Sequence, residues 1–216
     1  MKMLSKFQSW LTQACVVALL MLTGISSAQT NSSPKNILVL GDSLSAEYGI
    51  DRGTGWVALL EKRLDEKKFN YKVINASISG ETTVGGKSRL QALLSIHQPS
   101  IVIIELGAND AIRGLELDAT ATNLKEMIAM VQTEKAQVLL VAMRIPPNYG
   151  KAYTDKFFSL YASVAKDSKA NLVPFFLQGV ADKPEMFQPD RIHLKAEAHP
   201  TMLNNVWAQL QRLLKK

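Results

Sequence analysis

Short apolar runs alternate with amphipathic segments along most of this chain. The runs are rich in β-branched residues and leucine, which favours strands, and they cover residues 36–40, 71–74, 101–106, 137–142 and 171–176. Runs 101–106 and 137–142 are almost continuously apolar, as expected for strands that are covered on both faces. We therefore interpret the runs as the strands of a central sheet.

Between the runs, apolar residues recur at spacings of three and four, the pattern of helices that bury one face. The pattern covers residues 55–69 and recurs around residues 90–97, 124–131, 157–164 and 202–213. Strands that alternate with helices imply right-handed βαβ units and a parallel sheet between layers of helices, so the predicted fold class is α/β. In such sheets the ligand binds at the carboxyl ends of the strands, which is where a site is expected.

The first residues have the pattern of an export signal rather than of this fold. Two lysines precede an uncharged, mainly apolar stretch over residues 11–23, and Ser26 and Ala28 supply the small residues of a cleavage site. A membrane anchor is the alternative, but the apolar core is too short to cross ~30 Å of hydrocarbon. We expect a signal peptide over residues 1–28 and a single domain over residues 29–216, a usual length for one domain.

The composition limits the cellular compartments and the classes of binding partner that the protein is expected to have. The one cysteine, Cys15, lies within the predicted signal peptide, so the mature protein would have none. A cysteine-free exported protein needs no redox partner, which fits a bacterial periplasm or the surrounding medium. The net charge of +6 falls to +4 when the two lysines of the signal are removed. This bias is compatible with transient contact with membrane lipid but too small to indicate nucleic-acid binding, and we expect a monomer.

Polar residues with catalytic potential follow the first strand. The run 36–40 leads into Gly41-Asp42-Ser43-Leu44-Ser45, which places Ser43 at the turn into a helix. Backbone N–H groups at such a turn favour an attacking oxygen and the oxyanion that it creates. Ser and Asp after a strand are also ordinary helix caps, and the segment is not the G-x-S-x-G elbow. The segment is therefore compatible with a catalytic serine and with a helix cap.

The next two strands are also followed by candidate site residues. Gly80 comes after the second strand, where its backbone N–H could face a substrate. Asn109 follows the third strand and could direct its side-chain amide across the top of the sheet. A plain turn glycine and an Asx turn are the alternatives for these two residues.

Asp190 and His193 come late in the chain, separated by two residues. That spacing lets Asp190 accept a hydrogen bond from His193 Nδ1, which leaves Nε2 free for a nucleophile. The pair is a weak signal alone, but the four segments together supply a nucleophile, a base, an orienting acid and two oxyanion donors. We interpret the remaining histidines as structural, His97 as packed or capping and His199 as capping or at the surface.

The sequence resembles a known family at these positions, the SGNH or GDSL hydrolases, and within it the bacterial periplasmic acyl-thioesterase, lysophospholipase and arylesterase group. The resemblance spans about residues 35–214 and includes INASISGET, RLQALLSIHQPSIVIIELGANDAIRGL, MRIPPNYGKAYTDKF and LVPFF. It implies a flavodoxin-like three-layer α/β/α sandwich with a parallel five-stranded sheet. The roles it implies are nucleophile for Ser43, triad partners for Asp190 and His193, and oxyanion donors for Ser43, Gly80 and Asn109.

The resemblance also implies hydrolysis of carboxylic esters and thioesters without metal or cofactor, on aryl esters, fatty-acyl esters, acyl-CoA and lysophospholipids. The family often has Gly where Arg191 stands, and Arg191 could attract a phosphate-bearing leaving group to the rim of the site. Apolar residues after the strands could wall an acyl channel, or could merely anchor loops: Leu44, Ile112, Leu115, Ile145, Pro146, Pro147 and Tyr149. Two rival functions stay open, a carbohydrate acetylesterase on the same fold and a periplasmic lipid-binding protein with an idle site.

Overall fold

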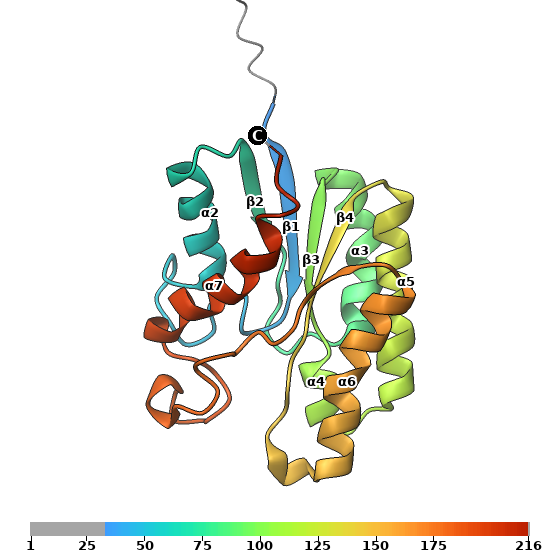
Figure 1. Ribbon diagram of the computed structural model, residues 1–216, viewed down its shortest axis with the longest axis vertical. Coiled ribbons are helices and arrows are strands. Elements are labelled where there is room, and N and C mark those ends of the chain that lie inside the picture. Colours follow the sequence, from blue (N-terminus) through green and yellow to red (C-terminus); the bar gives the residue numbers. More distant parts are fainter. Residues whose placement is uncertain (1–32, 216) are drawn as a thin grey trace, which may run out of the picture. The chain divides into compact units, whose positions relative to one another are not determined.

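The computed structural model describes residues 33–215 of the 216-residue chain. Its sheet has five parallel strands in the order β2-β1-β3-β4-β5 (Figure 1). The strands are β1 Lys35–Gly41, β2 Tyr71–Asn75, β3 Ile101–Glu105, β4 Gln137–Val141 and β5 Asn171–Val173. The predicted fold class and the five-stranded parallel sheet are therefore confirmed.

The strand order reverses at β1, and this reversal positions the site. From β1 the chain passes to β2 on one side, and then returns to β3 on the other side of β1. Connections that diverge in this way open a crevice at the carboxyl ends of the central strands. The register pairs Gly41 with Glu105, so the segments that follow β1 and β3 leave the sheet side by side.

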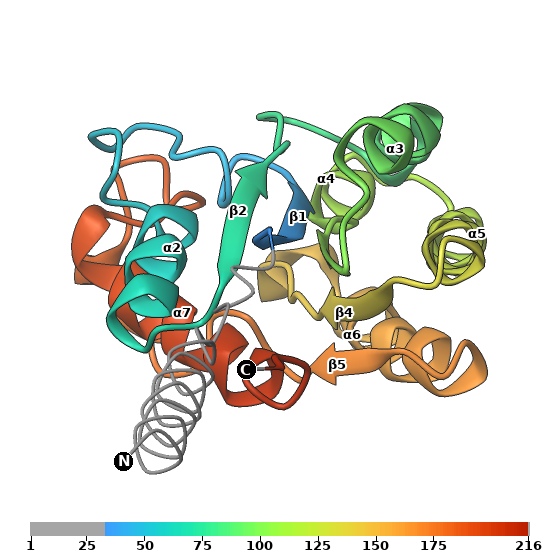
Figure 2. The ribbon, with the colours of Figure 1, turned by 90° about the horizontal axis from the view of Figure 1, so that it is seen from above.

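Helices cover both faces of the sheet. On one face α2 (Trp56–Glu66) packs against α7 (His199–Leu210). The other face carries α3 Thr83–His97, α5 Leu117–Thr133 and α6 Lys151–Asp167, and the short helix α4 Ala108–Ile112 follows β3 directly. Figure 2, seen from above, shows the two groups of helices on opposite sides of the strands. This arrangement is the predicted three-layer α/β/α sandwich.

The core lies between the sheet and its two helical layers. Residues 37–40 of β1, 101–104 of β3 and 139–141 of β4 have no exposed surface at all. Because these positions are covered on both faces of the sheet, they are apolar whichever way the side chain points. Continuous burial therefore accounts for the unbroken apolar runs in the sequence.

Three elements differ from the expectation. Strand β5 ends at Val173 rather than at residue 176, because Pro174 has no N–H to continue the ladder. The sequence pattern does not predict α4, since five residues are too few for an apolar period to show. The last helix ends at Leu210, and Leu213 packs against the core from the turns that follow.

The predicted signal peptide over residues 1–28 lies outside the described residues, as do the first residues of the predicted domain. Pro34–Lys216 forms one unit by its internal contacts. Within residues 33–215 no helix is long and apolar enough to cross a membrane.

Candidate active site

Ser43 lies in the turn that follows β1. The turn is closed by hydrogen bonds from the N–H groups of Ser45 and Ala46 to the carbonyl of Asp42, at 3.2 and 2.9 Å. It does not lead straight into a helix as expected, because Glu47 has a φ of 58°, outside the right-handed helical region. A tight turn rather than a helix N-terminus therefore presents the Ser43 hydroxyl.

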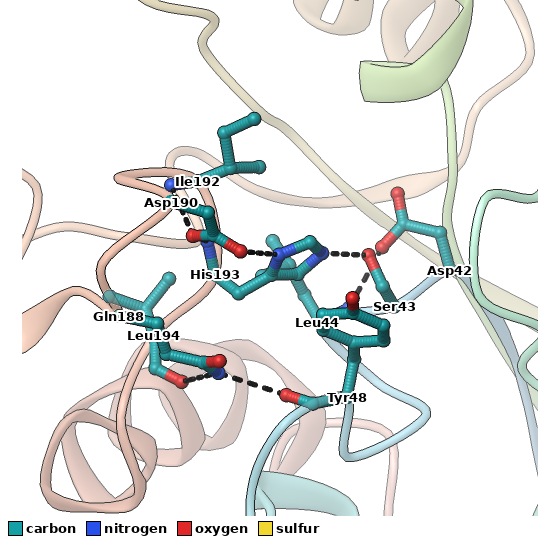
Figure 3. Close-up of polar contacts among 9 residues, drawn as sticks. All are labelled: Asp42, Ser43, Leu44, Tyr48, Gln188, Asp190, Ile192, His193 and Leu194. Atoms are coloured by element: carbon teal, nitrogen blue, oxygen red, sulfur yellow. Dashed lines mark hydrogen bonds and ion pairs between the residues drawn. The ribbon is translucent and has the colours of Figure 1, made fainter.

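His193 and Asp190 reach Ser43 from a loop close to the end of the chain (Figure 3). Ser43 Oγ lies 2.8 Å from His193 Nε2, and His193 Nδ1 lies 2.7 Å from Asp190 Oδ2. The structure thus brings these three predicted site residues into one hydrogen-bonded chain. In this geometry His193 can take the proton of Ser43, while Asp190 orients the imidazole ring and stabilises its protonated form.

Hydrogen bonds keep Asp190 ionised. Its Oδ2 faces the ring of His193, and its Oδ1 accepts from the backbone N–H groups of Ile192 and His193 at 2.9 and 3.0 Å. Burial acts to raise the pKa of Asp190, but these hydrogen bonds outweigh it and lower the pKa to about 2. Asp190 therefore carries a negative charge at neutral and mildly acidic pH.

The loop of His193 is tied to the turn of Ser43. The backbone N–H of Gln188 donates to the His193 carbonyl at 2.8 Å, and the Gln188 side chain donates to the carbonyls of Leu194 and Tyr48, each at 2.9 Å. The rings of Tyr48 and His193 pack together, with centroids 4.3 Å apart. Figure 3 shows how this tie spans the two loops. These contacts keep Ser43 and His193 next to each other, although the two residues are 150 positions apart in the sequence.

Three candidate oxyanion donors keep hydrogens that no described residue uses. The backbone N–H groups of Ser43 and Gly80 donate to no acceptor within residues 33–215. Asn109 Nδ2 directs one of its two hydrogens to Asp42 Oδ2 at 3.0 Å and keeps the other. Unpaired backbone donors are rare in folded proteins, so these groups suit the negative charge of an oxyanion.

The loop of Gly80 is held beside the end of β1. The N–H of Ile78 donates to the Gly41 carbonyl at 3.1 Å, and Arg113 Nη2 donates to the Gly80 carbonyl at 2.8 Å. Gly80 has a φ of 77°, which favours glycine, and a Cβ here would approach Arg113 Nη2 to 3.3 Å. The glycine is therefore needed for the turn itself, whatever its N–H binds.

Ser43 and His193 border a mainly apolar cleft of about 1650 Å³. Most of the predicted substrate-binding residues line it: Leu44, Ile112, Ile145, Pro146, Pro147, Tyr149 and Arg191. Leu115 does not line the cleft and is 42% exposed. Gly80 also lies outside the set of lining residues.

Comparison with known proteins identifies the family to which this chain belongs. The model of the GDSL-like lipase/acylhydrolase family matches residues 39–200, from within β1 to beyond His193. The chain belongs to this family. Esterase TesA of Pseudomonas aeruginosa is 46% identical over 198 residues, which cover 92% of this chain and 96% of that protein. Thioesterase 1/protease 1/lysophospholipase L1 of Escherichia coli K12 is 40% identical over 178 residues, or 82% and 84% of the two chains.

A solved structure shares the fold of this GDSL-like hydrolase. It is a psychrotrophic esterase, EstA from Pseudoalteromonas sp., in a form inhibited by monoethylphosphonate. The two chains are 39% identical, with a TM-score of 0.79 over 82% of this chain and 97% of the other. The similarity therefore covers most of this chain and nearly all of the other.

Several residues of the hydrolase site are not evident from the sequence pattern. Tyr48 and Gln188 lie in loops, where only the folded chain reveals that they contact the segments of Ser43 and His193. Phe175 and Phe187 line the cleft from the segments after β5, and neither is among the predicted site residues. Glu105 had a visible signal, because it is a charged residue at the end of an apolar strand and has no exposed surface.

The other two histidines make structural contacts. His199 is 2% exposed, and its Nδ1 accepts a hydrogen bond from the N–H of Trp56 at 3.0 Å, so it caps α2 and does not lie at the surface. His97 ends α3, and its carbonyl accepts from Asn36 Nδ2 at the amino end of β1, the edge of the sheet opposite Ser43. Within residues 33–215, no three His, Cys, Asp or Glu side chains gather as they would around a metal ion.

Proposed function

We propose that this protein is a serine esterase that hydrolyses carboxylic esters and thioesters through an acyl-enzyme on Ser43. The observation that carries the proposal is the hydrogen-bonded chain from Ser43 Oγ to His193 at 2.8 Å and from His193 to Asp190 at 2.7 Å. A hydroxyl is a weak nucleophile by itself, and a base oriented by a third group is what activates it. Membership of the acylhydrolase family supports the same chemistry.

In the proposed reaction, His193 Nε2 takes the proton of Ser43 as Ser43 Oγ attacks the acyl carbonyl carbon. The N–H groups of Ser43 and Gly80 and the amide of Asn109 then stabilise the oxyanion, each by roughly 3 kcal/mol. His193 returns the proton to the leaving alcohol, phenol or thiol as the bond to the acyl carbon breaks. Water repeats the attack with His193 as base, which releases the acid and restores Ser43.

The proposed substrates are fatty-acyl esters, aryl esters, acyl-CoA thioesters and lysophospholipids. The cleft beside Ser43 is mainly apolar and large enough, at about 1650 Å³, for an extended acyl chain. The cations Arg191, Lys151 and Lys195 also line it and could attract a phosphate-bearing leaving group. The names of two relatives, an esterase and a thioesterase/lysophospholipase, support these classes.

The two rival functions receive less support. An acetyl group of a carbohydrate ester would fill only a small part of a cleft of this volume. An idle lipid-binding site would not need a hydroxyl, a base and an acid in hydrogen-bonded order. A related esterase is inhibited by monoethylphosphonate, which supports an active rather than an idle serine.

We also propose export to the periplasm, as a monomer that contacts membrane lipid transiently and binds no nucleic acid. The support is the charge and apolar pattern of residues 1–28 and the absence of cysteine from the rest of the chain. N-terminal sequencing of the protein from a periplasmic extract should begin at Gln29. A protein that retains residues 1–28 in the membrane fraction would contradict the proposal.

The test of the activity is a hydrolysis panel with the wild type and Ser43→Ala. The panel contains p-nitrophenyl esters of increasing acyl length, acyl-CoA, a lysophospholipid and an acetylated sugar. We expect turnover of both esters and thioesters, higher kcat/KM for longer acyl chains, and loss of all turnover in Ser43→Ala. Turnover of the acetylated sugar alone would favour the carbohydrate acetylesterase, and binding of lipid without turnover would favour the idle site.

A further inference from the structure

Glu105 is a carboxyl group buried in the centre of the fold. It ends β3, where the four preceding residues are apolar, and it has no exposed surface. Its Oε2 accepts hydrogen bonds from Ser45 Oγ at 2.7 Å and from the Asp42 N–H at 3.3 Å. Its Oε1 accepts no hydrogen bond from the described residues, although it is buried. An ionised carboxylate with an oxygen that accepts no hydrogen bond would cost free energy in this buried position. A protonated carboxyl group would cost much less.

Asp42 is its neighbour and has the opposite pattern of contacts. It is 2% exposed, and both of its carboxyl oxygens accept hydrogen bonds. Oδ1 accepts from the Leu44 N–H and Oδ2 accepts from Asn109 Nδ2, each at 3.0 Å. A carboxyl group that only accepts hydrogen bonds is best satisfied when it is ionised. The residue that Asp42 holds, Asn109, is the side-chain oxyanion donor of the proposed function.

The two residues are neighbours, since the Asp42 N–H donates to Glu105 Oε2, and their carboxyl groups are too deeply buried for both to be ionised. Burial, followed by the charge of Asp42, raises the pKa of Glu105 well above its usual range. Burial also raises the pKa of Asp42, to about 6, although hydrogen bonds from Leu44, Glu105 and Asn109 and the charge of His193 oppose the increase. Near neutral pH the pair therefore holds one proton.

Few other titratable groups face this pair. His193, from the loop after β5, acts on Asp42 through its charge. Tyr161, from α6, faces Glu105, Asp42 and Asp110, and its hydroxyl donates to the Leu106 carbonyl at 2.9 Å rather than to a carboxyl group. No lysine or arginine within residues 33–215 forms a hydrogen bond or an ion pair with Glu105 or Asp42. Among the described residues, therefore, no lysine or arginine pairs with either carboxyl group, and a proton is left to neutralise one of the two charges.

We propose that Glu105 is a positioning residue that holds the shared proton and donates it in a hydrogen bond to Asp42, which keeps Asp42 a pure acceptor that directs Asn109 toward the oxyanion. The inference rests on the proposed function, because it presumes that Asn109 stabilises an oxyanion. If Asp42 carried the proton on Oδ2, it would face the Asn109 amide as a donor and favour the flipped amide. The flipped amide would present its oxygen, which repels the oxyanion.

The test compares an isosteric variant with an apolar one. In Glu105→Gln, the amide nitrogen replaces the protonated oxygen and donates to Asp42, and the amide oxygen still accepts from Ser45. We expect Glu105→Gln to keep kcat within about threefold of the wild type, because it reproduces the protonated carboxyl group. Glu105→Leu should lose kcat by about 10²-fold, with little change in KM, as for loss of one oxyanion donor.

Two readouts separate positioning from a merely structural role. Infrared spectroscopy at neutral pH should show the C=O stretching band of a protonated carboxyl group in the wild type, and this band should be absent from Glu105→Gln. The wild-type kcat should fall at alkaline pH as the pair loses its last proton, and Glu105→Gln, which has no such proton, should not show this fall.

The inference is overturned if the band is absent from the wild type or if Glu105→Gln loses as much kcat as a folded Glu105→Leu. Should Glu105→Leu fail to fold, the infrared band and the pH profile of Glu105→Gln still decide. The activity of Ser43→Ala identifies which claim has failed. If Ser43→Ala is active, the proposed function itself is wrong. If Ser43→Ala is inactive and Glu105→Gln is impaired, only the role of Glu105 is wrong.

Discussion

The replacement His199→Gln is expected to make the protein more resistant to acid. His199 begins α7, is 2% exposed, and accepts the N–H of Trp56 on its Nδ1 at 3.0 Å. Its ring also has a hydrogen bond with the backbone of Leu194, directly after His193. Protonation of Nδ1 would set one N–H against another and detach the start of α2. Burial lowers the pKa of His199 to about 4, although the charge of Glu47 and the bond to Leu194 oppose the decrease.

The sign and size of the effect follow from this pKa. The unfolded chain binds the His199 proton near the ordinary pKa of 6.5 and the folded chain only near about 4, so the contribution to stability is complete above 6.5 and is lost as the pH falls toward 4. The difference corresponds to a loss of at most about 3 kcal/mol in the free energy of unfolding. Asp42 has the opposite effect on the pH dependence of stability. Its pKa is raised to about 6 in the folded protein, so its contribution to the free energy of unfolding is lost as the pH rises.

The assay is urea unfolding of the wild type and His199→Gln at pH 7.5 and at pH 4. Glutamine can accept from the Trp56 N–H and donate to the Leu194 carbonyl without titrating. We expect similar stabilities at pH 7.5 and a variant that is more stable by about 2–3 kcal/mol at pH 4. Asp42 is present in both proteins, so its effect cancels in the difference. An equal loss of stability in both proteins between the two pH values would refute the reasoning.

Three further predictions concern the site. Asp190→Ala should lower kcat by about 10⁴-fold, less than the roughly 10⁶-fold loss in Ser43→Ala, because His193 remains but is no longer oriented; equal losses would contradict this order. Tyr48→Leu should lower kcat by about fivefold because the ring that packs on His193 is lost, with Tyr48→Phe as a control that keeps wild-type activity. Arg191→Gly should raise the free energy of unfolding by about 1 kcal/mol, since Arg191 has a φ of 59°. It should also raise KM for acyl-CoA but not for a neutral aryl ester, and a change in kcat for the neutral ester would contradict a role at the rim.

The sheet could be predicted because burial leaves a direct trace in the sequence. Residues 37–40 of β1, 101–104 of β3 and 139–141 of β4 are covered on both faces, so these positions are apolar and form clear runs; the buried Glu105, which ends β3, is an exception. Strand β5 lies at the edge of the sheet and is interrupted by Pro174, so its apolar run extended beyond the paired residues. Helix α4 is one turn long, and no period can be read from five residues.

The site was predictable where a residue follows a strand, and where a short spacing indicates the chemistry, as for Asp190 and His193. Ser43 and Asn109 could be placed because the carboxyl ends of neighbouring parallel strands meet at one edge. The contact of Tyr48 with His193 depends on how two loops fold over that edge, and no local pattern encodes it. Leu115 shows the same limit, because its place in the sequence after β3 and α4 does not reveal that it lies outside the cleft.

The central claim is that Ser43 forms a covalent acyl-enzyme after activation by His193. The most direct measurement is mass spectrometry of the protein after brief mixing with a slowly deacylated aryl ester, followed by digestion and mapping of the modified peptide. We predict one acyl group on Ser43 in the wild type and none in Ser43→Ala or His193→Ala. An acyl group on another residue, or full turnover with no acyl group on Ser43, would contradict the account.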